Sequence, residues 1–291
     1  MGVEKQFRVI KRKKFLLKEA PTKIELSVTK SEMKQQIQEN IQTLAQLQEM
    51  LYAQDRKGVL IIFQAMDAAG KDSMIKHVMS GINPQGCTVT SFKQPSTLEL
   101  DHDFMWRVHR AMPRRGEIGI FNRSYYEDVL VTKVHPDILL GERLPGINQV
   151  SDVTDAFYKK RYQTIKHFEK DMTQAGFTVL KFFLHLSKDE QKNRFLRRIQ
   201  LPDKHWKFSA ADMKERAYWE AYQLAYEQAI RATSTKKNPW YVIPADDKWT
   251  SRLLVSEIIN ERLTKLDLGF PEVTSEQAEA LKQSEQELQA E

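Results

Sequence analysis

The chain has 291 residues, of which 41% are hydrophobic and 29% charged, with a formal net charge of +6. This length and composition fit a globular protein with one full core, and the modest positive charge fits either an anionic partner or a solvated surface. No apolar run reaches the roughly 20 residues that cross a bilayer, and the basic run 11–14 lacks the apolar segment of a signal peptide. We therefore expect a cytoplasmic protein without a membrane partner. Cys87 is the only cysteine, which excludes an intrachain disulfide framework.

Composition divides the chain into three parts. Residues 1–30 form a basic N-terminal arm, 31–270 a single domain, and 271–291 an acidic C-terminal tail. The domain opens with hydrophobic residues at three- and four-residue steps, which predict an amphipathic helix from Ser31 to about Arg56.

Strands and helices then alternate along the domain. The predicted strands are 58–64, 87–92, 117–124, 176–187 and 239–249, and helices are predicted at about 71–80, 152–174 and 251–266. Alternation of this kind predicts an α/β fold in which a parallel sheet is covered by helices on both faces.

The first strand leads into "FQAMDAAGKDS", which resembles a phosphate-binding loop. Gly70 and Lys71 stand where the pattern G-x-x-x-x-G-K-[ST] requires them, but Ala65 replaces the first glycine and Asp72 replaces the hydroxyl residue that ligates magnesium. Asp67 would repel phosphate unless a divalent cation lay between them, so we assign Asp67 as a substitute Mg²⁺ ligand. The alternative is an ordinary strand-to-helix turn with a solvated Lys71.

The third strand in chain order ends in "FNRSYYED". Asn122 occupies the position at which an acid usually organises magnesium, so it is a further candidate ligand. Arg123 follows at the same edge of the sheet as Lys71, and its planar guanidinium suits phosphate oxygens. The alternative is a structural ion pair with Glu127 or Asp128.

The segment of about 188–216 is expected to be a helical lid. It carries nine Lys/Arg against five Asp/Glu, and its first helix must end before Pro202. Ser209 and Asp212 predict a capping box for the next helix. A mobile cationic lid stabilises a transferring phosphoryl group, whereas the alternative is a solvated pair of charged helices.

Three other groups of residues have weaker patterns. We expect some of the arginines of "RVHRAMPRR" (Arg107, Arg110, Arg114, Arg115) at the surface, where they could line a polyanion path, and the helical stripe Trp219, Tyr222 and Tyr226 in the core. The seven histidines lack metal-ligand spacing.

Together, "AMDAAGKDS", "VMSGINPQG", "HDFMWRVHRAMPRRGEIGIFNRSYYEDVLVTKVHP" and "RRIQLPDKHWKFS" make the sequence resemble the polyphosphate kinase 2 family from about Arg8 to Leu266. The resemblance implies a P-loop kinase-like fold and Mg²⁺- or Mn²⁺-dependent phosphoryl transfer between inorganic polyphosphate and a nucleotide. "FNRS" and "YYEDVLV" resemble the class III branch, which is associated with both AMP and ADP as acceptors and with ATP as a product.

The resemblance implies roles for particular residues. Asp67, Lys71 and Arg123 are the expected catalytic residues, and Asn122, Arg123 and Glu127 face the acceptor nucleotide. The predicted phosphate- and polyphosphate-binding residues are Ala68, Ala69, Gly70, Lys71, Asp72, Ser73, Lys133, Arg198, Lys204 and Lys207. A homo-oligomer is expected, with other nucleotides as further substrates and without a nucleic-acid partner.

Two rival functions stay open at this point. An ATP-dependent nucleoside monophosphate kinase would share the fold, although the missing Ser/Thr after Lys71 and the surplus of basic residues count against it. A polyanion-binding protein would account for the net charge but not for an acid inside the loop.

Overall fold

The computed structural model describes residues 2–10 and 14–291, so residues 11–13 of the basic arm lie outside the described residues. Among the residues it describes, five parallel strands form one sheet in the order β2-β3-β1-β4-β5. The strands are β1 (Gly58–Ala65), β2 (Cys87–Ser91), β3 (Ile118–Asn122), β4 (Phe177–His185) and β5 (Trp240–Pro244). This arrangement confirms the predicted parallel α/β fold.

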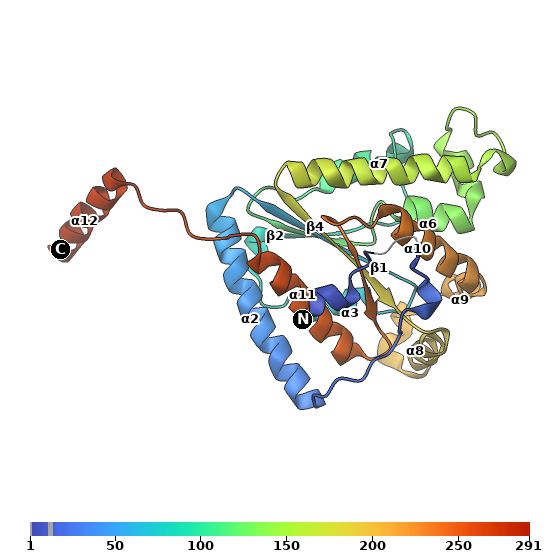
Figure 1. Ribbon diagram of the computed structural model, residues 1–291, viewed down its shortest axis with the longest axis horizontal. Helices are drawn as coiled ribbons and strands as arrows, with labels where there is room; N and C mark the ends of the chain where they lie inside the picture. The colour runs from blue at the N-terminus through green and yellow to red at the C-terminus, as the bar shows by residue number, and fades with distance from the viewer. Residues whose placement is uncertain (1, 11–13) are drawn as a thin grey trace.

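Helices connect the strands and flank the sheet (Figure 1). The α-helices are α1 (Val3–Phe7), α2 (Lys30–Gln54), α3 (Lys71–Val78), α4 (Thr97–Leu100), α5 (Trp106–Ala111), α6 (Glu127–Val134), α7 (Asp155–Gln174), α8 (Lys188–Gln200), α9 (Ala210–Ala217), α10 (Trp219–Thr233), α11 (Lys248–Thr264) and α12 (Ser275–Gln289). Short 3₁₀ helices are η2 (Leu17–Glu19), η3 (Pro84–Gly86), η4 (Pro136–Glu142), η5 (Val150–Asp152) and η6 (Pro202–Lys207).

Several element ends differ by a few residues from the sequence expectation, and the end of the last strand and the start of α9 have a local explanation. The last strand ends at Pro244 instead of near Trp249, because the Asp247 carboxylate accepts hydrogen bonds from the backbone N–H groups of Trp249 and Thr250 and starts α11 there. Ser209 caps α9 through the N–H of Ala211, so the predicted capping box is wrong. Asp212 instead pairs with Arg198 at 3.4 Å.

The central strand β1 is buried along its whole length, which explains its unbroken apolar sequence. Leu60 and Ile62 contribute to one core, which also contains residues of α6, α7 and α10. Val59, Ile61 and Phe63 contribute to the other, with residues of α2, α3 and α11. The alternation of side chains along the strand therefore divides the hydrophobic residues between the two faces of the sheet.

The order of the strands creates a crevice at one edge of the sheet. After β1 the chain passes to β2, which lies beyond β3 on one side of the sheet. After β3, the neighbour of β1, it passes in the opposite direction, beyond β1, to β4. Two neighbouring strands whose connections diverge leave a crevice outside their carboxyl ends, where ligands of open α/β sheets bind. The loops that follow β1 and β3 both lie at this crevice.

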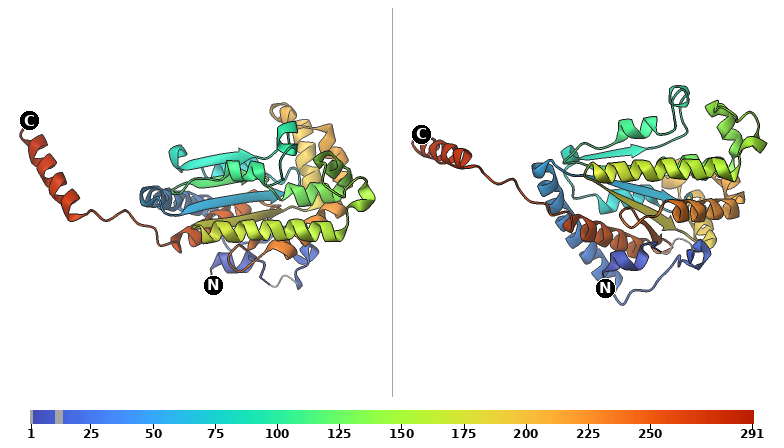
Figure 2. Two further views of the ribbon diagram at one scale, coloured as in Figure 1. Left: turned by 90° about the horizontal axis from the view of Figure 1, so that it is seen from above. Right: turned by 45° about the horizontal axis from the view of Figure 1, so that its top comes forward.

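The N-terminal segment packs against the domain, whereas the C-terminal segment is exposed. Near the N-terminus, Glu4 is buried against Arg262 and Lys265, and the N–H of Val9 donates to the carbonyl of Trp240 at 2.9 Å. At the other end, α12 lies beyond an extended segment and projects from the body of the molecule (Figures 1 and 2), and residues 271–291 are all exposed.

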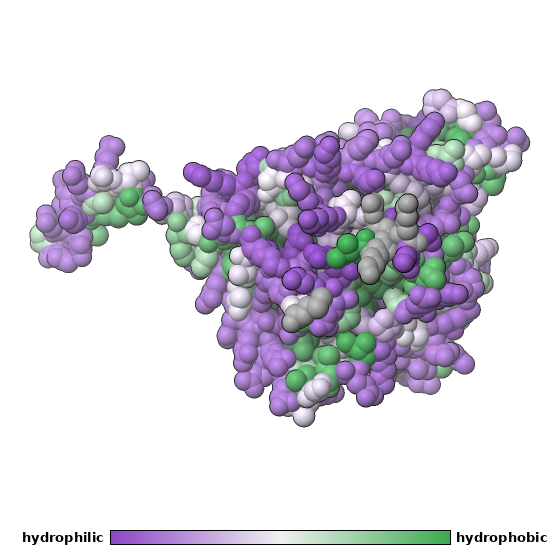
Figure 3. All heavy atoms as spheres, viewed as in Figure 1, coloured by the Kyte–Doolittle hydropathy of each residue, from purple (hydrophilic) through white to green (hydrophobic). Residues whose placement is uncertain are grey.

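The face drawn in Figure 3 is mostly hydrophilic. Within residues 2–10 and 14–291, none of the helices combines the length and apolar character needed to span a bilayer.

Candidate active site

The loop between β1 and α3 has two residues in the left-handed backbone region. Gly70 has φ +99° and Ala68 has φ +61°. Glycine reaches this region without strain, whereas for alanine it costs free energy that the surrounding structure must offset. Lys71 then begins α3 and donates from Nζ to the carbonyl of Ala65 at 3.0 Å. Burial, followed by the charge of Arg123, lowers the pKa of Lys71.

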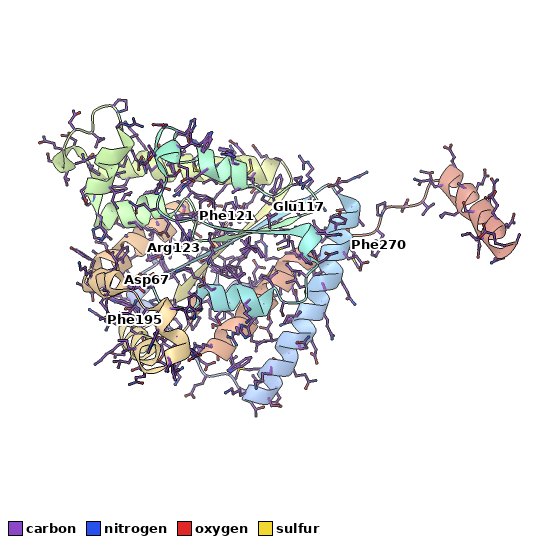
Figure 4. The ribbon with its side chains drawn as sticks, turned by 180° about the vertical axis from the view of Figure 1, so that it is seen from behind. Asp67, Glu117, Phe121, Arg123, Phe195 and Phe270 are labelled. Carbon is purple, nitrogen blue, oxygen red and sulfur yellow. The ribbon has the colours of Figure 1, made fainter. Side chains whose placement is uncertain are left out.

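Arg123 directly follows β3 and also has left-handed backbone geometry, with φ +62°. Its guanidinium lies 3.2 Å from the Asp67 carboxylate and 3.9 Å from that of Glu127. Figure 4 shows Asp67 and Arg123 near each other at this end of the sheet. The ion-pair alternative for Arg123 thus holds for Glu127 but not for Asp128, which pairs with Arg107.

A second contact crosses the crevice. The side-chain amide of Asn122 donates to the Asp72 carboxylate at 2.7 Å. Asp72 is the residue that stands in place of the usual hydroxyl, and this contact ties the start of α3 to the end of β3. The backbone of Asp67 is also fixed, because Gln191 on α8 donates to its carbonyl at 2.9 Å.

The crevice opens into a cavity of about 620 Å³, which we call the basic cavity. Among the described residues that line it, nine are lysine or arginine and three are aspartate. The cations are Lys71, Lys93, Arg123, Arg194, Arg197, Arg198, Lys204, Lys207 and Lys248, and the acids are Asp67, Asp72 and Asp212. So large an excess of positive charge attracts a polyanion strongly.

A second cavity of about 500 Å³, the mixed cavity, meets the basic cavity at Asp67, Arg123 and Asp212. Its other lining residues include apolar, aromatic and acidic groups: Met66, Leu130, Val131, Ile138, Tyr222, Tyr226, Glu127, Asp137 and Glu215. Burial raises the pKa of Glu127, although Arg123 and Lys71 oppose the shift. One cavity is therefore cationic, the other amphipathic, and Asp67 and Arg123 lie where they join.

Most of the residues predicted for the site come together here. The basic cavity is lined by Asp67, Ala68, Gly70, Lys71, Asp72, Ser73, Asn122, Arg123, Arg198, Lys204 and Lys207, and Glu127 lines the mixed cavity. Ala69 belongs to the β1–α3 loop but is buried, and its carbonyl accepts a hydrogen bond from Arg194.

Lys133 is separated from this group. It lies near the end of α6, pairs with Asp155 at 3.3 Å and lines another cavity with Tyr158 and Tyr162. Because helix geometry turns successive side chains to different sides, Leu130 and Val131 face the mixed cavity while Lys133 does not. The sequence prediction that Lys133 shares the phosphate site is at odds with this placement.

Some of the upstream arginines lie at the surface, as expected, since Arg110, Arg114 and Arg115 are exposed. Arg107 is buried, pairs with Asp128 at 3.7 Å and donates to the carbonyl of Lys93. Arg115 donates to the carbonyls of Arg56 and Ala175, next to the residues that begin β1 and β4. The opposite end of the sheet carries the crevice, so Arg115 cannot line it. In the predicted aromatic stripe, Trp219 and Tyr226 are buried as expected, and Tyr222 opens onto the mixed cavity.

Several lining residues were absent from the predicted site. Lys93 follows β2 and Lys248 follows β5, so both lie beyond carboxyl ends of strands, a signal that could have identified them. Arg194 was expected only as part of the lid. Its guanidinium donates to the carbonyls of Ala68 and Ala69 and, on the other side, to those of Ala245 and Asp246.

The site fits a magnesium ion that shares its ligands with a substrate. Within the described part of the chain, no three His, Cys, Asp or Glu side chains gather as a ready-made metal site. Mg²⁺ does not need one, because it keeps waters and binds through one or two carboxylates plus substrate phosphates. The Asp67 carboxylate, which opens onto both cavities, provides such a ligand.

Comparisons with known proteins agree on one family. Residues 27–269 match the family model for polyphosphate kinase 2. The chain is 50% identical to an ADP-polyphosphate phosphotransferase of Rhodopseudomonas palustris over 98% of both chains, and 47% identical to an AMP/ADP-polyphosphate phosphotransferase of Meiothermus ruber over 79% of this chain and 80% of the relative.

A solved structure also resembles the whole molecule. The crystal structure of polyphosphate kinase 2 from Arthrobacter aurescens TC1 superposes with a TM-score of 0.86 at 36% identity, covering 97% of each chain. The family model, the relatives and this structure agree with the resemblance inferred from the sequence motifs. The chain belongs to the polyphosphate kinase 2 family.

Proposed function

We propose that this chain transfers the terminal phosphoryl group of inorganic polyphosphate to nucleoside mono- and diphosphates, converting AMP to ADP and ADP to ATP. The observation that carries the proposal is the meeting of two unlike cavities at Asp67 and Arg123. One suits a long polyanion and the other suits a nucleotide, whose base and sugar need apolar and hydrogen-bonding groups. The names of the two relatives support the same substrates.

The chemistry requires no protein nucleophile. A phosphate oxygen of the acceptor attacks the terminal phosphorus of polyphosphate in line, a new P–O bond forms, and the bridging P–O bond to the rest of the chain breaks. The leaving group is polyphosphate shortened by one unit, which stays in the basic cavity. The reverse reaction follows the same path.

Catalysis then rests on positioning and on charge. Lys71 and Arg123 hold the reacting phosphates from the β1–α3 loop and the end of β3, and Arg198, Lys204 and Lys207 bind the chain from the lid. Magnesium, when bound through Asp67, would neutralise charge on the phosphate oxygens, and manganese has the same ligand preference. Asn122 orients Asp72 through their hydrogen bond, and Glu127 faces the acceptor in the mixed cavity.

Burial raises the pKa of Glu127, and its partner Arg123 opposes the shift. Glu127 lines the mixed cavity proposed for the acceptor, so its carboxyl is a candidate for selecting between mono- and diphosphates.

The proposal is tested by chromatography of nucleotides after the purified chain is incubated with long-chain polyphosphate, Mg²⁺ and either AMP or ADP, without added ATP. We expect ADP and ATP from AMP, and ATP from ADP. ATP from ADP alone would restrict the acceptor range to diphosphates. No product with polyphosphate, but ADP from ATP and AMP, would replace the proposal by an ATP-dependent nucleotide kinase.

Salt-sensitive binding of RNA or DNA with no transfer would instead favour the polyanion-binding alternative. A homo-oligomeric state and a cytoplasmic location stay predictions from the sequence. Light scattering coupled to size-exclusion chromatography measures the first of these directly.

A further inference from the structure

The backbone of Arg123 needs an explanation that the two cavities do not give. A non-glycine residue at φ +62° is strained, and such a conformation persists only where the surroundings fix it. The N–H of Arg123 donates to the carbonyl of Phe63 at 3.0 Å, which holds one side of the residue. The other side continues into Ser124, Tyr125 and Tyr126, which are fully buried.

These three buried residues are fixed by their side chains. The hydroxyl of Ser124 accepts hydrogen bonds from the side chain of Gln64 and from the N–H of Tyr126, both at 3.2 Å. The hydroxyls of Tyr125 and Tyr126 donate to the same carboxylate oxygen, Glu169 Oε1, at 2.9 and 2.7 Å. The side chains of Tyr125 and Tyr126 are thus hydrogen-bonded to the same oxygen of Glu169.

Glu169 lies on α7 and forms a hydrogen-bonded ion pair with Lys181 on β4. Its second oxygen accepts a hydrogen bond from Lys181 Nζ at 2.6 Å, and Lys181 also donates to the carbonyl of Thr233 on α10 at 3.1 Å. Glu169 is 1% and Lys181 0% exposed. The network therefore joins α7, β4 and α10 to the turn between Arg123 and Glu127.

Stability alone is a weak reason for this arrangement. A buried ion pair is often no more stabilising than apolar residues of similar volume, because removing both charges from water is costly. Burial and the charge of Glu169 raise the pKa of both tyrosines, so both hydroxyls stay protonated donors. What the polar network provides beyond packing is a fixed orientation for two side chains, and hence for the backbone next to them.

We propose that Glu169 is a positioning residue, which acts through Tyr125 and Tyr126 to hold the backbone of Arg123 in the geometry that phosphoryl transfer needs. This inference rests on the proposed function. Glu169 is not among the described residues that line either cavity, so the proposed role is an indirect one.

The first test removes the two hydroxyls and keeps the aromatic packing. We expect Tyr125→Phe/Tyr126→Phe to lower kcat for ATP formation from ADP and polyphosphate by about 10- to 100-fold, with both KM values little changed, since misplacement of a reacting group by an ångström costs rate on this scale. Tyr158→Phe is the control: it removes a different buried hydroxyl, which lies on α7 and donates to the carbonyl of Thr132 at 2.7 Å.

The control should lower the melting temperature by less than the double variant, because it removes one hydrogen bond to a neutral carbonyl, and should leave kcat close to that of the wild type. If the double variant loses melting temperature but keeps the wild-type kcat, the network is purely structural and the proposal is overturned.

The second test distinguishes the hydrogen-bond acceptor at position 169 from the negative charge of Glu169 as the feature on which kcat depends. Glu169→Gln/Lys181→Met and Glu169→Leu/Lys181→Met both remove the ion pair, but only the glutamine can still accept from the tyrosines. We expect the glutamine variant to retain a kcat several-fold above that of the leucine variant. Equal kcat values in two folded variants would contradict the proposal.

Hydrogen exchange separates this inference from the proposed function. We expect faster amide exchange at 123–127 in Tyr125→Phe/Tyr126→Phe than in Tyr158→Phe, whatever the substrates are. Absence of transfer in the wild-type chain would refute the proposed function, and the exchange rates would still decide whether Glu169 holds the turn. Unchanged exchange in the double variant would refute the positioning role.

Discussion

At the scale of single residues, Asp67 and Lys71 are the groups on which the proposed transfer depends most directly. Both line the basic cavity, and Lys71 is fixed by the carbonyl of Ala65. Loss of one preorganised charge contact typically costs about 10²–10³ in rate. We expect Asp67→Ala and Lys71→Ala to lower kcat by at least this factor while circular dichroism and the melting temperature show a folded protein.

Lys133→Ala provides the comparison for these two variants, because it removes a lysine from a different cavity. Its transfer rate should stay within about twofold of the wild type, as for substitutions away from a site. A loss as large as that of Lys71→Ala would return Lys133 to the phosphate site predicted from the sequence.

Asp128 predicts a pH dependence of stability. Burial raises the pKa of this carboxyl from 3.8 to about 7, although Arg107 and Arg161 oppose the shift. A raised carboxyl pKa means that the folded state binds the proton more tightly than the unfolded state does. The contribution is therefore fully present below about pH 4 and is lost as pH rises through 7.

We expect the free energy of unfolding of Asp128→Asn to fall less between pH 5 and 8 than that of the wild type. Urea denaturation at several pH values measures this difference. Parallel curves for the two proteins would show that Asp128 is already ionised in the folded state.

At the scale of elements, α8 has a structural role in addition to the lid role predicted for it from the sequence. Arg194 on this helix donates to two carbonyls of the β1–α3 loop and to two that follow β5. Its guanidinium thus joins the carboxyl ends of two strands, and truncation would leave several buried carbonyls without donors. Arg197, in the last turn of α8, is exposed and lines the basic cavity.

Arg194→Ala should therefore reduce the free energy of unfolding by about 3 kcal/mol, and Arg197→Ala by less than about 0.5 kcal/mol. Arg197→Ala should instead raise the KM for polyphosphate, more strongly at low salt, since only a charge has been removed. Denaturant titration and steady-state kinetics on the two variants separate these effects. Equal losses of stability would contradict the bracing role of Arg194.

At the scale of the whole molecule, charge and packing are unevenly distributed. Cations gather around the crevice, whereas the tail after 270 is acidic, exposed and remote from the sheet in Figure 1. We expect removal of 271–291 to leave the melting temperature and kcat unchanged, because no core residue is lost. A lower melting temperature, or a change of mass in light scattering, would show that the tail packs in solution.

The sequence by itself determined the layers of this protein and the loop at their centre. The unbroken apolar run of β1 and the three- to four-residue periodicity of α2 both depend on near neighbours in the chain, so both elements could be predicted within two residues. The same holds for the β1–α3 loop, because the glycine at 70 indicates a left-handed backbone conformation and Lys71 marks the start of the helix that follows. The family resemblance added the substrates that we propose.

Only the tertiary structure decided which side chains share a cavity. Lys93 and Lys248 are more than 150 residues apart in the chain, yet both line the basic cavity. The parallel strands β2 and β5, which precede them, have their carboxyl ends on the same side of the sheet. The pairing of Arg123 with Asp67, the bracing by Arg194 and the separation of Lys133 depend on how strands and helices stack. Hydrophobic patterns do not encode these long-range distances, since they report only which face of an element is buried.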